Sequence, residues 1–430
     1  MREAYSWAWV EAQVAQATEV WNGSARSAAP RGPQYCPQQQ RQREQAYDEG
    51  LREVEREAKK KPRTRAERLA AQERITASFG RFSAAALDLE GDAVRLLTDD
   101  FLPVGTKLAR WARRFDPNLS MPDIIQACRN AWTACGLQPL LGERVELTPS
   151  ILGYSLLYPY TDNYLDRVDV TAEEKRRFSA RFRRRLDGGI LGVEDARETA
   201  LWALVELIEN QYPREAFPRV FDCLLAIHRA QGDSVAQLQS AVEWADSEVL
   251  RMSCAKGGTS VLADACLARG TLSEQESRFA FEWGVLLQLG DDLQDVHEDL
   301  QRGSVTLFSR AAALGTPLDS LAIQLLNFAE RVGARMDELP CGSAAFKDLL
   351  RMSWRSLIVG AVADSHEFFS PGFLAEAERS SPFRFEFLRA RRNRLASREG
   401  LYATLFEAFL EAPEDDKDAL PAPVPALAVV

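Results

Sequence analysis

Apolar residues recur every three or four positions along most of this chain, and no segment shows a convincing alternation of apolar and polar residues. This spacing predicts an all-α protein. Helix starts can also be located from capping signals. Thr148 is a predicted N-cap because Pro149 follows it at the first helical position, and Thr171 with Glu174 forms a predicted capping box for the next helix.

Two stretches depart from this helical spacing. Residues 30–68 are rich in Gln, Arg, Glu and Lys and poor in branched apolar side chains, so we expect no core there. The last nineteen residues contain four prolines, which favours a flexible segment. We therefore predict a polar N-terminal extension over residues 1–75, helical or disordered in part, a helical domain over 76–411, and a flexible tail over 412–430.

Five carboxylates crowd into nine positions of the segment "LLQLGDDLQDVHEDLQRG", residues 286–303, directly after an apolar run. On a helical wheel at about 100° per residue, one face is aromatic and glycine at its start and carboxylate at its end. The residues on this face are Phe281, Gly284, Gln288, Asp291, Asp292, Asp295, Asp299 and Arg302. Such a helix would line a cavity with an apolar floor and an anionic mouth.

Carboxylates four residues apart on a helix repel one another by about 0.2–0.5 kcal/mol, so we expect a cation to bind them. A second pair, Asp162 and Asp166, has the same spacing near a predicted helix end, where the helix dipole disfavours negative charge. Oxygen donors without His or Cys suit Mg²⁺. Each group also has a plainer interpretation, as a solvated acidic face or as a helix end that runs into an acidic loop.

The two acidic groups resemble the aspartate-rich motifs of the class I isoprenoid synthases, which include prenyl diphosphate synthases, squalene and phytoene synthases, and terpene cyclases. "GVLLQLGDDLQD", residues 284–295, is similar to the second motif, G-x-x-x-Q-x-x-D-D-x-x-D. "DNYLD", residues 162–166, resembles the first motif, D-D-x-x-D, with Asn163 in place of the second aspartate. The resemblance covers residues 147–312. It implies a single large helical bundle whose aspartate-rich helices face a central cavity.

The resemblance also implies roles for individual residues. The Mg²⁺ ligands would be Asp162, Asp166, Asp291, Asp292 and Asp295, and all but Asp292 are also predicted to be catalytic. The residues that bind the substrate diphosphate would be Lys256, Arg251, Arg302 and Gln288. The aromatic residues of the cavity would be Phe281 and Tyr158. For Lys256 there is an independent reason, because Gly257 and Gly258 are expected to break a long helix and let the lysine approach a ligand. Arg251 could equally be an ordinary surface arginine.

The expected activity is ionisation of an allylic prenyl diphosphate with release of pyrophosphate. A chain-elongating synthase carries a basic G-G-K-x-x-R element, which "GTKLAR", residues 105–110, only approximates, so we favour a terpene synthase. However, "DDLQDVHED" lacks the serine found in the second motif of most terpene cyclases. The alternatives are a condensing synthase, elongating or head-to-head of the squalene and phytoene type, and a non-catalytic bundle that binds isoprenoids or serves as a partner subunit.

Composition and charge limit the partners and the cellular location that we expect. A formal net charge of −10 works against a nucleic-acid partner. The chain has no apolar run long enough for a bilayer and begins with a polar stretch, so we expect a cytoplasmic protein without stable membrane insertion. Its seven cysteines form no C-x-x-C pair, which argues against a zinc site or a disulfide framework. A homodimer is expected by analogy with the family alone.

Overall fold

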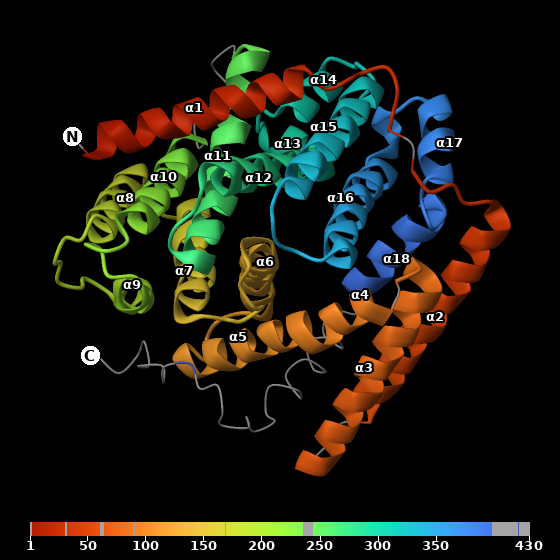
Figure 1. Cartoon of the computed structure of the whole chain (residues 1–430), viewed down its shortest axis with the longest axis horizontal. Helices are drawn as coiled ribbons and strands as arrows, with labels where there is room; N and C mark the ends of the chain where they lie inside the picture. The colour runs from red at the N-terminus through yellow and green to blue at the C-terminus, as the bar shows by residue number, and fades with distance from the viewer. Residues whose placement is uncertain are drawn as a thin grey trace.

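The computed structural model describes residues 2–30, 32–60, 64–89, 91–167, 169–234, 244–397 and residue 420. Every regular element within these residues is a helix, which confirms the predicted all-α class (Figure 1). None of the described helices is long and apolar enough to cross a membrane.

The first part of the chain forms α1 (Arg2–Asn22), α2 (Pro37–Lys59), α3 (Arg65–Leu87), α4 (Gly91–Arg95), the π-helical turn η1 (Leu96–Phe101), α5 (Leu102–Phe115), α6 (Met121–Leu137) and the 3₁₀ turn η2 (Gln138–Leu141). The middle part forms α7 (Pro149–Asp166), α8 (Ala172–Leu186), α9 (Ala196–Gln211), α10 (Pro218–Ser234), α11 (Asp246–Arg269), α12 (Glu274–Gln294) and α13 (Val296–Arg302). The last part forms α14 (Leu307–Ala313), α15 (Asp319–Asp337), α16 (Ala344–Asp364), η4 (His366–Phe368), α17 (Pro371–Arg379) and α18 (Phe385–Ser397).

Local capping chemistry starts the helices at the predicted positions. The Thr148 side chain accepts a hydrogen bond from the backbone N–H of Ile151 at the start of α7. At the start of α8, the Thr171 hydroxyl and the Glu174 carboxylate each accept a hydrogen bond from the other residue's backbone N–H, at 3.2 and 2.9 Å. These contacts satisfy backbone donors that a helix start leaves unpaired.

Helix α11 lies at the centre of the bundle and packs against α12 more extensively than any other pair of helices does. Glycines permit this close approach. A Cβ atom at Gly284 would lie 2.1 Å from the carbonyl oxygen of Gly257, and one at Gly258 would lie 2.4 Å from the ring of Phe281. The expected helix break at Gly257 and Gly258 is wrong, because α11 continues through both residues. Their role is to let two helices touch.

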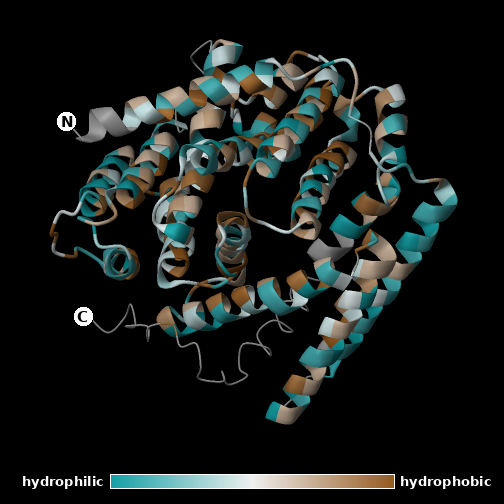
Figure 2. Ribbon diagram, viewed as in Figure 1, coloured by the Kyte–Doolittle hydropathy of each residue, from teal (hydrophilic) through white to brown (hydrophobic). Residues whose placement is uncertain are grey.

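Helix α1 crosses one side of the bundle above α10 and α11 (Figure 1). It contributes Val10, Val14, Ala17 and Trp21 to the main core. Apolar and polar residues alternate along α1 and α5 in Figure 2, as expected for helices with one buried face. The residues before position 76 therefore do not all lie outside the core.

The polar part of the N-terminal region forms a hairpin of α2 and α3 that projects from the bundle (Figure 1). Its base is tied to the C-terminal helices. Arg384 forms an ion pair with Glu44 at 2.6 Å, and Arg391 forms one with Asp48 at 2.7 Å. Except for Leu420, the predicted tail lies outside the described residues.

Candidate functional site

The acidic segment of the sequence lies where α12 ends. Asp291 and Asp292 are in the last turn of α12, Asp295 is its C-cap, and α13 begins at the next residue. Asp299 lies in α13, so two short stretches of helix present the carboxylates rather than one continuous helix. The chain thus concentrates negative charge at the end of a helix whose preceding turns are buried.

Asp292 is held in place by two neighbours. It is 6% exposed, and its two carboxylate oxygens accept hydrogen bonds from Gln288 Nε2 at 2.7 Å and from Ser253 Oγ of α11 at 2.9 Å. Desolvation raises the pKa of Asp292 despite these two bonds. Gln288, predicted to contact diphosphate, is therefore engaged with an aspartate of the second motif.

Asp291 and Asp299 are the most strongly perturbed carboxylates of this group. Asp291 is exposed to solvent, yet enough protein surrounds it for desolvation to raise its pKa to about 7, with further increases from Asp292 and Asp295. Desolvation and the same two neighbours raise the pKa of Asp299 to about 7, although Thr306 Oγ1 lies 3.3 Å from its carboxylate. A nearby positive charge would favour the ionised form of both carboxylates.

Lys256 faces this whole group from α11. Its positive charge lowers the pKa of each of the four aspartates at positions 291, 292, 295 and 299. It forms no ion pair with any described carboxylate, so its ammonium is not committed to one of them. Arg129 of α6 also acts on Asp291. Sequence reasoning missed Arg129, because only the packing of α6 brings it there.

The first motif lies at the end of α7. Asp162 accepts hydrogen bonds from Thr161 Oγ1 at 2.9 Å and from Gln231 Nε2 of α10 at 3.1 Å. Asn163 turns instead to α6, where its Nδ2 donates to Asp123 Oδ1 at 2.6 Å. Asp166 is the last residue of α7, and its side chain lies outside the described part of the protein. Gln231, which belongs to no predicted motif, therefore orients one predicted metal ligand.

Partly accessible residues recur every four positions on the inner sides of α7 and α11. On α7 these residues are Tyr154, Tyr158 and Asp162, and on α11 they are Lys256 and Ser260. Desolvation raises the pKa of Tyr154 well above 10, and an interaction with Ser260 partly offsets this. These side chains keep partial solvent access on two helices that contact each other.

Three predicted residues have other partners. Arg251 lies 3.8 Å from Glu11 of α1 in an exposed ion pair. Arg302 pairs with Glu298 at 2.5 Å on the surface, although its charge also acts on Asp295. Phe281 is fully buried with its ring against Gly258, so it occupies the position of a core aromatic.

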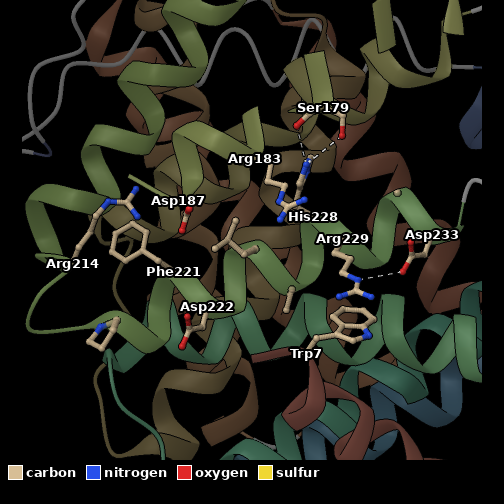
Figure 3. Close-up of a pocket in the computed structure, with 14 residues that line it drawn as sticks. Trp7, Ser179, Arg183, Asp187, Arg214, Phe221, Asp222, His228, Arg229 and Asp233 are labelled. Carbon is tan, nitrogen blue, oxygen red and sulfur yellow. Dashed lines mark hydrogen bonds and ion pairs between the residues drawn. The ribbon is translucent and has the colours of Figure 1, made fainter. Parts of the chain in front are cut away.

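A separate cavity of about 460 Å³ lies between α8 and α10 and is bordered by Trp7 (Figure 3). Its basic side chains are engaged. Arg229 stacks on Trp7 and lies 3.8 Å from Asp233, while Arg214 pairs with Glu209 at 2.8 Å. No residue predicted for the site is among those that line this cavity.

Comparisons with protein-family models, curated proteins and solved structures find no match for this chain. Among the described residues, no group of three or more His, Cys, Asp and Glu side chains is arranged to hold a metal ion. Mg²⁺ commonly uses only one or two carboxylates and completes its shell with water and substrate phosphates. The donors at the end of α12 fit this mode, since they are hard oxygens with raised pKa values.

Proposed function

We propose that the protein is a magnesium-dependent enzyme of the class I isoprenoid synthase type. It would ionise an allylic prenyl diphosphate and release pyrophosphate. The observation that carries this proposal is the placement of Lys256, uncommitted to any described carboxylate, opposite the aspartates at the end of α12. A diphosphate and its metals would complete this arrangement of charges.

Each residue of the site would have a distinct task. Asp291, Asp295 and Asp162 would hold Mg²⁺, which when bound neutralises the diphosphate and stabilises it as a leaving group. Lys256 would bind a diphosphate oxygen. The hydrogen bonds from Ser253 to Asp292 and from Gln231 to Asp162 would orient those carboxylates.

The terpene synthase remains our preferred activity. In the segment 105–110, Gly105 packs against Trp132, since a Cβ atom there would lie 2.7 Å from the indole ring. Lys107 and Arg110 both interact with other groups of the chain. This favours a packing role for the segment over a second diphosphate site. The condensing alternative is favoured by Arg129, whose charge acts on Asp291. A second cation beside the acidic group could bind a second diphosphate.

A second candidate is a bundle that binds isoprenoids without reacting. It is favoured by the lack of a preformed three-ligand metal cluster among the described residues. The prenyl diphosphate substrate and the homodimer expected from the resemblance stay predictions.

The purified protein should be incubated with Mg²⁺ and allylic diphosphates of increasing length, with and without isopentenyl diphosphate. A terpene synthase gives pyrophosphate and a hydrocarbon or alcohol from the allylic substrate alone. A longer diphosphate formed only with isopentenyl diphosphate identifies an elongating synthase, and a product of doubled carbon number identifies head-to-head condensation. Absence of reaction with every substrate would reject the enzyme proposal.

A further inference from the structure

A carboxyl group without a partner lies deeper in the bundle on α11. Asp264 is eight residues beyond Lys256, about 12 Å along the helix axis at 1.5 Å per residue. It is 3% exposed, and its Oδ1 accepts no hydrogen bond from the described residues. Native proteins rarely leave such a group unpaired, and those that do so often use it to hold water or a ligand.

The surroundings of Asp264 come from three helices. Its charge raises the pKa of Tyr154 on α7 and the pKa of Cys135 on α6, so the carboxyl lies close to both. The Cys135 thiol donates to the carbonyl of Glu146 at 3.5 Å and leaves the carboxyl unsatisfied. Ser260, one turn before Asp264, interacts with the Tyr154 hydroxyl.

This group of side chains selects a particular ligand chemistry. Burial raises the pKa of Asp264 well above its ordinary value, and no charged neighbour contributes to the shift. This shift favours the protonated carboxyl, which has one donor and one acceptor. Among the described residues, no cation acts on Asp264, so a phosphate would lack a positive partner at this carboxyl. An uncharged hydroxyl can both donate to and accept from this group.

We propose that Asp264, Tyr154 and Ser260 form a polar subsite that binds an uncharged hydroxyl between α7 and α11. The choice of an isoprenoid as the ligand rests on the proposed function. The hydroxyl has two possible sources. It belongs either to an isoprenoid alcohol or to a water molecule that adds to the allylic cation. In the second case a C–O bond forms, one O–H bond of water breaks, and its proton leaves with the released pyrophosphate.

The test is a binding measurement in metal-free buffer, with farnesol and the hydrocarbon farnesene as matched probes. Tryptophan fluorescence reports binding to the whole protein. We expect wild type to prefer the alcohol by about fivefold, the worth of one or two hydrogen bonds. Asp264→Leu should reduce this preference to below twofold, whereas Asp264→Asn, which keeps a donor and an acceptor, should retain most of it. Tyr154→Phe should lose part of the preference.

Ser365→Ala is the control, since the Ser365 hydroxyl is also buried and unpartnered but lies at the end of α16. It should leave the preference unchanged. If wild type shows no preference for the alcohol, or if Asp264→Leu keeps it, the subsite is overturned and the acid is purely structural. If Asp264→Leu fails to fold, the other two variants decide. A reduced preference in Tyr154→Phe together with a retained preference in Asp264→Asn supports the subsite. An unchanged preference in Tyr154→Phe overturns it.

Binding of farnesol needs neither Mg²⁺ nor turnover, so its outcome is separate from the pyrophosphate assay. A protein that prefers the alcohol and never releases pyrophosphate would keep the subsite and lose the proposed activity. With an active enzyme, turnover in ¹⁸O-labelled water distinguishes the two sources. Labelled alcohol from wild type that falls at least severalfold in Asp264→Leu identifies water as the source. A hydrocarbon product without label excludes water and leaves an isoprenoid alcohol as the ligand of the subsite.

Discussion

Gly284 of α12 lies directly against Gly257 of α11, so closely that a Cβ atom on Gly284 would be 2.1 Å from the Gly257 carbonyl oxygen. One turn further along α12, Gln288 reaches the position beside Asp292, and Ser253 of α11 donates to the same aspartate at 2.9 Å. The contact between the two glycines therefore holds α11 and α12 close together next to these residues.

Gly284→Ala should lower the free energy of unfolding by about 1–3 kcal/mol or more, because the new methyl group meets backbone rather than a flexible side chain. Gly360→Ala in α16 is the matched control. A Cβ atom at Gly360 meets nothing within 4 Å, so alanine should stabilise that helix by about 0.5–1 kcal/mol. Urea unfolding measures both. Equal effects of the two substitutions would contradict the close contact.

The helical class and several helix starts could be predicted from the sequence, because a capping box such as Thr171 with Glu174 involves only neighbouring residues. The role of Gly257 and Gly258 could not. A glycine pair is compatible with a helix break and with close packing, and only the partner helix decides between them. The N-terminal extension over residues 1–75 was predicted from the polar composition of residues 30–68. That composition carries no information on α1, which precedes it and belongs to the core.

Trp21→Ala should show that α1 is part of the bundle. The indole is 1% exposed and meets Phe328 edge to face at 5.8 Å between ring centroids. Truncation should therefore cost about 3–5 kcal/mol of unfolding free energy. Leu314→Ala, at a side chain that is 74% exposed, should change it by less than about 0.5 kcal/mol. A Trp21→Ala protein as stable as wild type would mean that α1 detaches in solution.

The metal-free protein should lose stability as the pH rises toward neutrality. The pKa values of Asp291 and Asp299 are raised from 3.8 to about 7, so the folded state keeps protons that the unfolded chain has released. Their contribution therefore falls from about pH 4 to about pH 7 and is constant above it. Asp291→Asn should flatten this slope in thermal melts with EDTA. Glu298→Gln, at an exposed ion pair, should not.

Lys256→Gln should weaken the binding of inorganic pyrophosphate in the presence of Mg²⁺ by about tenfold or more, as expected for loss of a charged hydrogen bond. Arg251→Gln removes the same charge from an exposed pair with Glu11 and should change binding by less than about twofold. Isothermal titration calorimetry compares the two variants. Equal losses would show that only the net charge of the protein matters.

Within the site, the motif predicts where the aspartates of α12 lie and that Lys256 faces them. The residues that orient them carry no local signal. Ser253, Gln231 and Arg129 come from three different helices, and only the packing of these helices brings them to their partners. Arg251 is the opposite case. Its position in the sequence predicted contact with the diphosphate, but its side chain forms an ion pair with Glu11 of α1.

In the proposed function, the aspartates at the end of α12 support release of pyrophosphate from an allylic diphosphate. The most direct test measures Mg²⁺-dependent pyrophosphate release by wild type, Asp291→Asn and the surface control Glu298→Gln, with folding checked by circular dichroism. We predict that Asp291→Asn loses activity by at least about a hundredfold while it stays folded, and that Glu298→Gln stays within about twofold of wild type. Near-normal release by folded Asp291→Asn would contradict the account.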